Sequence, residues 1–391
     1  MVGVKSARGV AWLALSVLLT LPGLAYGPLG LHASPPTEAF IFGSAILGAA
    51  FLLSWAAEIA QLEVSQALAL AILALIAILP EYAVDLYLAW RAADDPYYGH
   101  LAAANMTGAN RLLIGLGWPV IVWLFWLRWR KTGIDLAPAD MIAVRFLGVA
   151  TVYAFVIAEV GKFWWLDTVV LVGLFFWYLV RTSRLGAGEP ELVGPALLIS
   201  RLPRSWRLFC NVLLFAYSAV LIFLAAEPFA ESLIDTGEHF GIDEFFLIQW
   251  IAPLASEAPE FIIAGLWTMR RHATMALSAL ISSKVNQWTL LIGTISLVYS
   301  ISAGRIASLV LDEQQRHEIF LTAAQSIFAV VMLSDRRLTW WQAFLLFLPF
   351  AVQLAVPGLR LEVAWIYLGL TAVWGFHYRR ELLEVFHRPR A

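Results

Sequence analysis

Twelve long apolar runs are separated by short polar loops, and each run is close to the roughly 20 residues with which an α-helix crosses a bilayer. The runs occupy residues 10–29, 38–60, 64–91, 99–127, 141–160, 164–181, 207–234, 243–269, 273–300, 317–334, 339–356 and 361–378. They are continuous and do not alternate with period two, which indicates helices and not the strands of an outer-membrane barrel. The pattern predicts an all-α integral membrane protein with about twelve transmembrane helices.

The composition agrees with this pattern, because 61% of the residues are hydrophobic and 14% are charged, against about 25% charged residues in soluble domains. No polar stretch is long enough for a separate soluble domain, so we expect the chain to lie in the lipid bilayer. Nucleic acid is not an expected partner. The single cysteine, Cys210, excludes an intrachain disulfide and a CxxC metal site. The run at 10–29 follows Lys5 and Arg8, as in a signal peptide, but no A-x-A site follows it, so we expect a retained anchor.

Basic residues are distributed unequally between the two sides of the twelve-helix map. One side holds 18 of the 26 lysines and arginines, and the other holds five. The first set is Lys5, Arg8, Arg128, Arg130, Lys131, Arg181, Arg184, Arg201, Arg204, Arg207, Arg270, Arg271, Arg336, Arg337, Arg379, Arg380, Arg388 and Arg390; the second is Arg91, Lys162, Arg305, Arg316 and Arg360. Because basic loops stay on the inner side, we expect a multi-pass protein of the plasma membrane with both termini in the cytoplasm.

Two Pro-Glu pairs, Pro80-Glu81 and Pro259-Glu260, lie in the middle of apolar runs. An ionised carboxylate at membrane depth is costly and usually marks an ion or proton pathway. Each proline also frees a backbone carbonyl four residues back, on Ile76 and Ala255, because proline has no N–H to donate. A carboxylate beside a freed carbonyl, twice in one chain, indicates a buried cation site.

The longest connection, 182–205, is basic, contains glycine and proline, and separates two similar halves. Asn110 and Gly117 are seven residues apart in the first half, and so are Asn286 and Gly293 in the second. On the topology above, the two Pro-Glu helices cross the membrane in opposite directions, which predicts inverted repeats with a midplane site at their interface. The predicted domains are an N-terminal extra helix (1–37), a first repeat (38–182), a basic cytoplasmic linker (183–206), a second repeat (207–356) and a C-terminal extra helix with a basic tail (357–391).

These motifs resemble the two α-repeats of the calcium/cation antiporter superfamily, which includes the sodium/calcium exchangers. The family pattern is G-T-S-x-P-E on one helix and G-N-x-x-G-S-N on the next. The first repeat here has L-P-E at 79–81 and A-N-M-T-G-A-N at 104–110, and the second has S-E-A-P-E at 256–260 and L-I-S-S-K-V-N at 280–286.

The resemblance implies two five-helix repeats around a cation site and transport by antiport without a cofactor. It assigns the metal-ligand roles to Glu81 and Glu260, with Asn110, Asn105 and Asn286 as further cation ligands. Pro80, Pro259 and Gly108 are expected to break the helices at the site. The expected partners are small inorganic cations, and the residues leave open whether these are Ca²⁺, Na⁺ or H⁺.

The sequence departs from the family pattern at the site itself. In the first repeat, Ala77-Ile78-Leu79 stands where the family has Gly-Thr-Ser, and Arg111 stands where an apolar residue is expected. In the second repeat, Glu257 replaces a serine, Lys284 replaces a glycine and Ile281 replaces an asparagine. Asp85 lies four residues from Glu81 and Glu257 three residues from Glu260, so each acidic pair shares a helix face. Such close carboxylates cannot all stay ionised in a low dielectric without a cation or a proton.

Lys284 and Arg111 would supply a permanent counter-charge and leave a net charge of about −2 before protonation. A built-in ammonium weakens divalent binding and favours proton coupling, because a buried lysine changes its pKa readily.

Two functions stay open from the sequence. The first is a secondary-active cation antiporter with alternating access, in which the helices 38–60 and 207–234 move against the rest. The second is a non-transporting scaffold or sensor whose site is locked by pairs between Lys284 or Arg111 and the glutamates. Asp85 and Glu257 would be ligands or partners of those cations, and the asparagines ligands or interhelical hydrogen bonds. No Walker loop, metal-spaced histidines or hydrolase constellation is present, so an enzyme is not expected.

Overall fold

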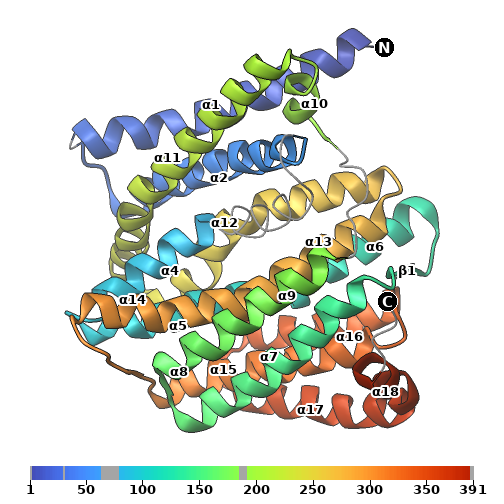
Figure 1. Ribbon diagram of the computed structural model, residues 1–391. Coiled ribbons are helices and arrows are strands. Elements are labelled where there is room, and N and C mark those ends of the chain that lie inside the picture. Colours follow the sequence, from blue (N-terminus) through green and yellow to red (C-terminus); the bar gives the residue numbers. More distant parts are fainter. Residues whose placement is uncertain (1, 30, 63–78, 185–191, 388–391) are drawn as a thin grey trace. The chain divides into compact units, whose positions relative to one another are not determined.

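The computed structural model describes residues 2–29, 31–62, 79–184 and 192–387, which are almost entirely helical (Figure 1). The α-helices are α1 (Val2–Leu29), α2 (Pro35–Ala60), α4 (Leu79–Arg91), α5 (Pro96–Leu112), α6 (Trp118–Trp129), α7 (Asp140–Val160), α8 (Trp165–Asp167), α9 (Gly173–Ser183), α10 (Pro195–Ile199), α11 (Arg204–Phe240), α12 (Glu244–Met269), α13 (Ala273–Asn286), α14 (Ile292–Ser302), α15 (Glu313–Met332), α16 (Trp340–Ala355), α17 (Arg360–His377) and α18 (Arg379–His387). Three π-helical segments, η1 (Leu113–Gly117), η2 (Thr168–Val172) and η3 (Gln287–Leu291), interrupt longer helices, and a 3₁₀ turn, η4 (Pro357–Leu359), precedes α17.

Every predicted apolar span is helical in its described part except for one or two residues at the ends of some spans. Within these residues, seven helical segments are long and apolar enough to cross a membrane: Gly9–Tyr26, Pro35–Ala60, Pro96–Trp129, Asp140–Val160, Trp165–Ser183, Arg204–Phe240 and Pro357–His377. The remaining predicted spans correspond to α4, α12, α13 to α14, α15 and α16. Residues 64–78 of the third span, 185–191 of the linker, and Arg388 and Arg390 lie outside the described residues. The helical membrane-protein class is therefore confirmed, and the count of twelve crossings stays a prediction.

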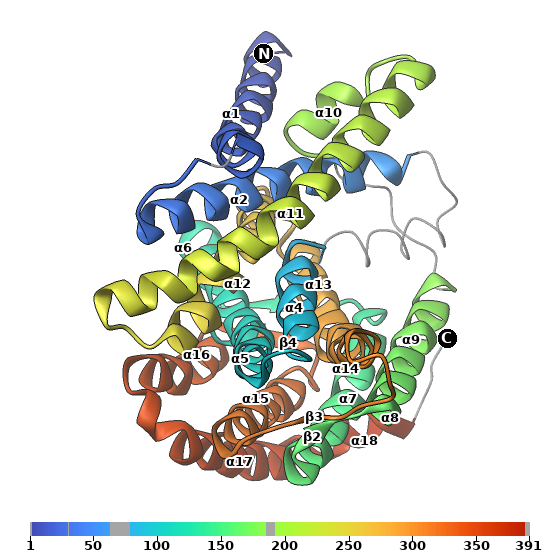
Figure 2. The same ribbon diagram turned by 90° about the vertical axis from the view of Figure 1, so that its left-hand side faces the viewer.

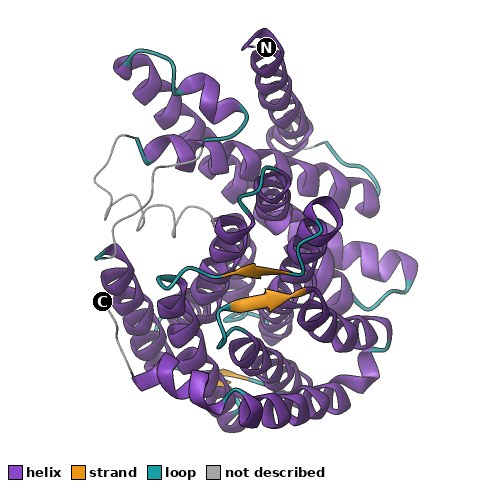
Figure 3. Cartoon of the chain, turned by 90° about the vertical axis from the view of Figure 1, so that its right-hand side faces the viewer, coloured by secondary structure: helices purple, strands orange, loops and turns teal. Residues whose placement is uncertain are grey.

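Two short antiparallel ribbons, which the sequence did not predict, join loops of distant helices. Strand β1 (Gly133–Asp135) pairs with β4 (Arg337–Thr339), with Ile134 opposite Leu338. Strand β2 (Lys162–Phe163) pairs with β3 (Leu309–Val310). Figure 2 looks onto the end that carries β2 and β3, and Figure 3 onto the opposite end, where β1 and β4 lie in front. The ribbons thus connect the loops at the two ends of the same helices.

The chain divides into two compact units, each built from segments of both predicted repeats. Unit 1 comprises residues 1–87 and 182–260, and unit 2 comprises residues 88–181 and 261–391. The division passes through α4 and α12, so each of these helices begins in unit 1 and ends in unit 2.

In unit 1, α2 packs lengthwise against α11 and also against α1. A Cβ on Gly48 of α2 would lie 2.6 Å from the Ser16 carbonyl oxygen, so glycine permits the close approach of α1 and α2. The linker helix α10 packs against α2 in an apolar cluster of Phe51, Leu52, Trp55, Ile59, Ala196 and Ile199. The buried Glu58 carboxylate accepts the Val193 N–H at 2.9 Å. The described part of the basic linker is therefore fixed on α2.

In unit 2, α15 lies at the centre and packs against α5, α7 and α17, while α16 packs against α6 and η1. The largest fully buried side chains of unit 2 include the aromatic residues Trp118, Trp288, Phe163, Phe175, Phe328 and Tyr367. Two charged side chains, Arg111 and Lys284, are buried to the same degree. Because a charge in this environment needs a partner, these two residues direct attention to the polar groups around them.

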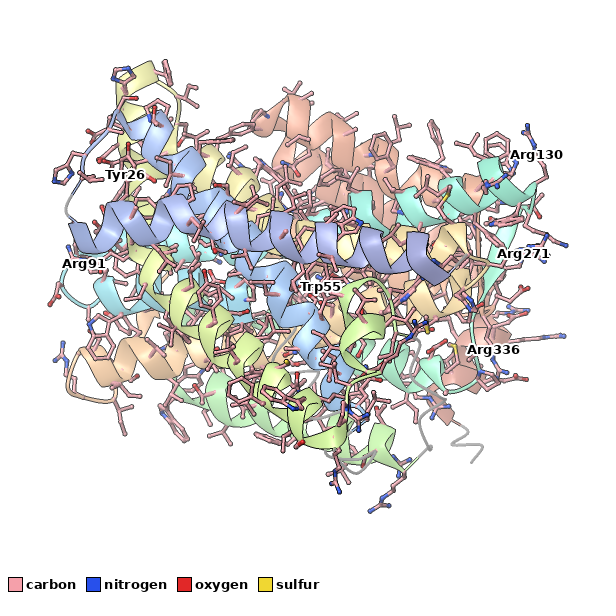
Figure 4. The ribbon with its side chains drawn as sticks, turned by 90° about the horizontal axis from the view of Figure 1, so that it is seen from above. Tyr26, Trp55, Arg91, Arg130, Arg271 and Arg336 are labelled. Carbon is pink, nitrogen blue, oxygen red and sulfur yellow. The ribbon has the colours of Figure 1, made fainter. Side chains whose placement is uncertain are left out.

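Three arginines with a left-handed backbone conformation lie at one end of unit 2. Arg130 and Arg271 follow α6 and α12 with φ of 56° and 72°, and Arg336, with φ of 63°, lies in the turn between α15 and β4. The left-handed conformation is common where a helix ends, and Arg130 is the C-cap of α6. Their side chains lie together at one end of unit 2 in Figure 4, and Arg91 lies at the opposite end. Cations at helix C-termini are favourable because the helix dipole is negative there.

Candidate cation-binding site

The four acidic residues predicted for the site all lie in unit 1. Glu81 and Asp85 occupy successive turns of α4 and are buried. Glu257 of α12 is buried, and Glu260, one turn further on, is half-buried. Tyr87 of α4 donates a hydrogen bond to the Glu231 carboxylate of α11, which ties the acidic helix to the α2–α11 pair.

The helix-breaking predictions need correction at two of three positions. Helix α12 continues through Pro259 to Met269, so this proline removes one hydrogen bond without ending the helix. Helix α5 also continues through Gly108 to Leu112, because a single glycine costs only about 1 kcal/mol in a helix interior. Pro80 is the second described residue of α4, and the residues before Leu79 lie outside the description.

The predicted amide ligands and Lys284 lie in unit 2, on α5 and α13. The Lys284 ammonium donates to the Asn110 side-chain oxygen Oδ1 at 2.7 Å and lies 3.3 Å from the Asn110 main-chain oxygen. It also lies 4.2 Å from the ring centroid of Trp288, a cation–π contact. Asn110 Nδ2 donates to the Met106 carbonyl at 2.7 Å, which fixes the amide orientation. The structure therefore brings the second repeat's lysine onto the first repeat's asparagine.

The other two predicted amides, Asn105 and Asn286, are buried as well. Among the described residues, no hydrogen-bond donor reaches the buried Oδ1 of Asn105. A buried oxygen without a donor carries a desolvation cost of about 1–3 kcal/mol. Such an oxygen fits the donor set of a cation, which Ca²⁺ fills with six to eight carboxylate, carbonyl, amide and water oxygens.

Both amide helices change to π-helical geometry directly after the asparagines. η1 begins three residues after Asn110, and η3 begins one residue after Asn286. A π-helical segment shifts the hydrogen-bond pattern by one residue and often occurs at functional sites. A π-helical segment thus begins within three residues of the asparagine in each half, and the sequence did not predict it.

Arg111, predicted as a counter-charge of the site, forms an ion pair with Glu318 of α15. Its Nη1 donates to the Gln353 side-chain oxygen of α16 at 2.8 Å. Glu318 also accepts a hydrogen bond from Nε of Arg360, the first residue of α17. The Arg111 charge is thus compensated inside unit 2 by a carboxylate that the sequence analysis did not consider.

A sequence signal for Glu318 exists in its own helix. Glu318, Thr322 and Gln325 follow one another at i, i+4 and i+7 along α15, which places polar side chains on one face of an apolar span. All three are buried. A polar stripe inside a membrane helix indicates polar partners on a neighbouring helix, here Arg111 and Arg360.

No three carboxylate, imidazole or thiol groups come together as a metal site within the described part of the chain.

Comparison with known proteins identifies the family. The profile described as sodium/calcium exchanger protein matches two stretches, residues 39–183 and 210–358. The chain belongs to the sodium/calcium exchanger family. A search of curated proteins finds no match.

Three solved structures are similar to this chain. The crystal structure of the H⁺/Ca²⁺ exchanger CAX is similar with a TM-score of 0.94 and 42% sequence identity, over 98% of this chain and 97% of that one. The sodium–calcium exchanger NCX_Mj has a TM-score of 0.57 and 17% identity, over 82% of this chain and 98% of that one. Native YfkE has a TM-score of 0.59 and 14% identity, over 94% and 98% of the chains. The last two similarities concern the fold alone.

Proposed function

We propose that this protein is a secondary-active cation antiporter that exchanges Ca²⁺ for protons. Family membership supports antiport of small cations, and CAX, which shares 42% of its sequence, is an H⁺/Ca²⁺ exchanger. The observation that carries the proton coupling is the Lys284 ammonium, which lies 2.7 Å from Asn110 Oδ1. A fixed cation on an amide proposed as ligand competes with a metal ion for that oxygen.

The proposed ligands are those expected from the sequence. Glu81, Glu260, Asp85 and Glu257 supply carboxylates, and Asn105, Asn110 and Asn286 supply amide oxygens. The buried Asn105 Oδ1 supports a ligand role, because a cation would provide the positive partner that this oxygen requires.

The charge of the proposed site follows from the pairing of Arg111. Because Glu318 compensates Arg111, Lys284 is the counter-charge that remains among the site residues. Four carboxylates and one ammonium give a net charge of about −3 before protonation, in place of about −2. This charge attracts a divalent cation, and its release leaves close carboxylates that must take up protons. Binding of Ca²⁺ and of protons is therefore mutually exclusive, which is the requirement for antiport.

Alternating access is proposed to involve α2 and α11 moving as one body. Their extended contact supports this, since the two helices pack lengthwise and α1 and α10 pack onto them. Helices in such contact shift together more easily than separately.

The test is uptake of ⁴⁵Ca²⁺ into everted membrane vesicles under an imposed pH gradient. We expect Glu81→Gln and Glu260→Gln to lose nearly all uptake, because each removes a proposed ligand charge at membrane depth. Glu238→Gln, an exposed residue of α11, is the matched control and is expected to retain it. Unchanged cation flux in Glu81→Gln contradicts the site, and uptake that persists after the pH gradient is collapsed contradicts proton coupling.

The second candidate is a non-transporting relative that acts as a scaffold or sensor. The Lys284–Asn110 contact favours it, since an internal ammonium can replace the transported ion permanently. This candidate predicts that the purified protein binds neither ⁴⁵Ca²⁺ nor ²²Na⁺ at any pH, whereas the antiporter binds at least one of them.

A further inference from the structure

A second buried charge cluster lies in unit 2, apart from the acidic residues of the proposed site. It consists of Arg111, Glu318 and Arg360, contributed by α5, α15 and α17. The side chain of Arg111 is 1% exposed and that of Glu318 is 0% exposed, while Arg360 is 21% exposed. Glu318 therefore lies between two guanidinium groups.

One neutral hydrogen bond connects the cluster to α16, and two others lie within α5 and α15. Arg111 Nη1 donates to Gln353 of α16, and its Nε lies 3.4 Å from the Thr107 carbonyl oxygen one turn earlier in α5. The Thr322 hydroxyl donates to the main-chain oxygen of Glu318 at 2.7 Å. The ion pair with Glu318 and the hydrogen bond to Gln353 fix the Arg111 side chain relative to α15 and α16.

Arg111 follows Asn110 directly, and η1 begins two residues after it. Its guanidinium is thus a permanent positive charge attached to the helix end that presents an amide of the proposed site. In a low dielectric an uncompensated charge on the neighbouring residue would repel a divalent cation at Asn110. Ion pairs buried in this way contribute little to stability compared with apolar packing, so their retention calls for another role.

We propose that Glu318 is a positioning residue for cation binding. Its carboxylate compensates the Arg111 charge and holds the guanidinium toward α15, so that no second positive charge besides Lys284 opposes a cation at Asn110. This proposal rests on the proposed function, because it assigns Asn110 to the cation site. It also gives α17, which lies outside the two repeats, an indirect part through Arg360.

The experiment compares ⁴⁵Ca²⁺ binding to the purified full-length protein in detergent. Glu318→Gln keeps the shape of the side chain and removes its charge, and we expect at least about tenfold weaker ⁴⁵Ca²⁺ binding. The double variant Arg111→Gln/Glu318→Gln removes both charges, and we expect it to recover most of the lost affinity. Recovery by a second mutation separates a charge effect from a loss of packing.

Two further variants serve as controls. Glu313→Gln removes a carboxylate from the same helix, but this side chain is 88% exposed, so we expect the affinity of the parent protein. Arg360→Gln leaves Glu318 to Arg111 alone, so we expect an affinity equal to or above that of the parent. A tenfold loss in Arg360→Gln would assign the cluster a packing role and overturn the proposal.

Thermal unfolding of the same proteins, measured without any cation, tests whether Glu318 compensates the charge of Arg111. We expect the double variant to unfold at a higher temperature than Glu318→Gln, because the single variant leaves a buried guanidinium without its carboxylate. The reverse order, or a double variant that does not fold, overturns the proposal. A parent protein that binds no ⁴⁵Ca²⁺ but shows the expected unfolding order would contradict the proposed function and leave the compensation of Arg111 by Glu318 established.

Discussion

The ammonium of Lys284 occupies a position that the family pattern gives to glycine, and this one difference changes what the neighbouring amide can do. Asn110 Oδ1 accepts from Lys284 Nζ at 2.7 Å, and its Nδ2 is used by the Met106 carbonyl. Trp288 covers the ammonium at 4.2 Å from the ring centroid. A metal ion that uses this oxygen must displace the lysine or find it deprotonated, which is a physical basis for competition between protons and cations.

Lys284→Met tests this competition, because methionine fills a similar volume without charge. We expect ⁴⁵Ca²⁺ to bind at least about tenfold more tightly at a fixed pH, since one positive charge leaves the proposed site and Asn110 Oδ1 is released. The measurement is the dissociation constant of the purified protein, with Lys131→Met in an exposed loop as the matched control. Weaker binding in Lys284→Met would show that the lysine supports the site rather than competing for it.

The sequence could indicate Lys284 and Asn110 because both lie in repeated motifs, but it could not indicate the partner of Arg111. Comparison of the two repeats reveals positions that share a role. Glu318 lies outside the repeated motifs, so that comparison does not identify it. The polar face of α15 indicates that Glu318 has a polar partner, but the contact with Arg111 joins helices far apart along the chain, so local spacing does not identify that partner. A carboxylate near the start of a span is usually assigned to the interface, and only packing shows that this one is buried.

At the level of single elements, η1 packs so closely on α16 that Gly115 cannot be replaced without strain. A Cβ on Gly115 would lie 2.3 Å from Cγ of Phe350. We expect Gly115→Ala to destabilise the protein by about 1–3 kcal/mol, the usual cost of overpacking. Gly173, which follows η2, has no atom within 4 Å of an added Cβ, so Gly173→Ala should be neutral or slightly stabilising. The thermal unfolding midpoints of both variants in one detergent give the comparison, and equal midpoints would mean that α16 moves to accommodate the methyl group.

The sequence predicts the α-helices better than the π-helical segments within them and the short β-ribbons between their loops. Continuous apolar runs fix where a chain can cross a membrane, and the described helices follow those runs. The π-helical segments depend on packing between helices, such as Gly115 on Phe350, and leave no periodic signal. The ribbons join Lys162 to Val310 and Gly133 to Thr339, and strands of two or three residues have no pattern of their own.

For the whole molecule, the compact units do not coincide with the two halves of the sequence. The family profile matches each half once, at 39–183 and 210–358, whereas unit 1 takes residues 1–87 and 182–260. The first helix of each predicted repeat, α2 and α11, packs against the other within unit 1. Inverted-topology repeats cross the membrane in opposite directions, so the predicted repeats 38–182 and 207–356 are best tested through their orientation.

The orientation prediction rests on the distribution of basic residues and can be tested with single cysteines. Cys210 is the only cysteine, so Cys210→Ser provides a background for adding one thiol at a time. Lys131 and Arg305 are exposed loop residues of unit 2 on opposite sides of the predicted topology. The arginines at one end of unit 2, Arg130 and Arg271 among them, belong to the set of 18 that we place in the cytoplasm.

We therefore expect a membrane-impermeant maleimide to label Arg305→Cys in intact cells, and Lys131→Cys only after the cells are permeabilised. The opposite pattern would reverse both termini, and labelling of both residues in intact cells would mean that the helices between them cross the membrane an even number of times. On the predicted map one span separates α4 from Lys131, and one span separates α12 from Arg305. The sides of Lys131 and Arg305 therefore also give the directions in which α4 and α12 cross the membrane. Opposite directions are the geometric condition for Glu81 and Glu260 to serve one cation.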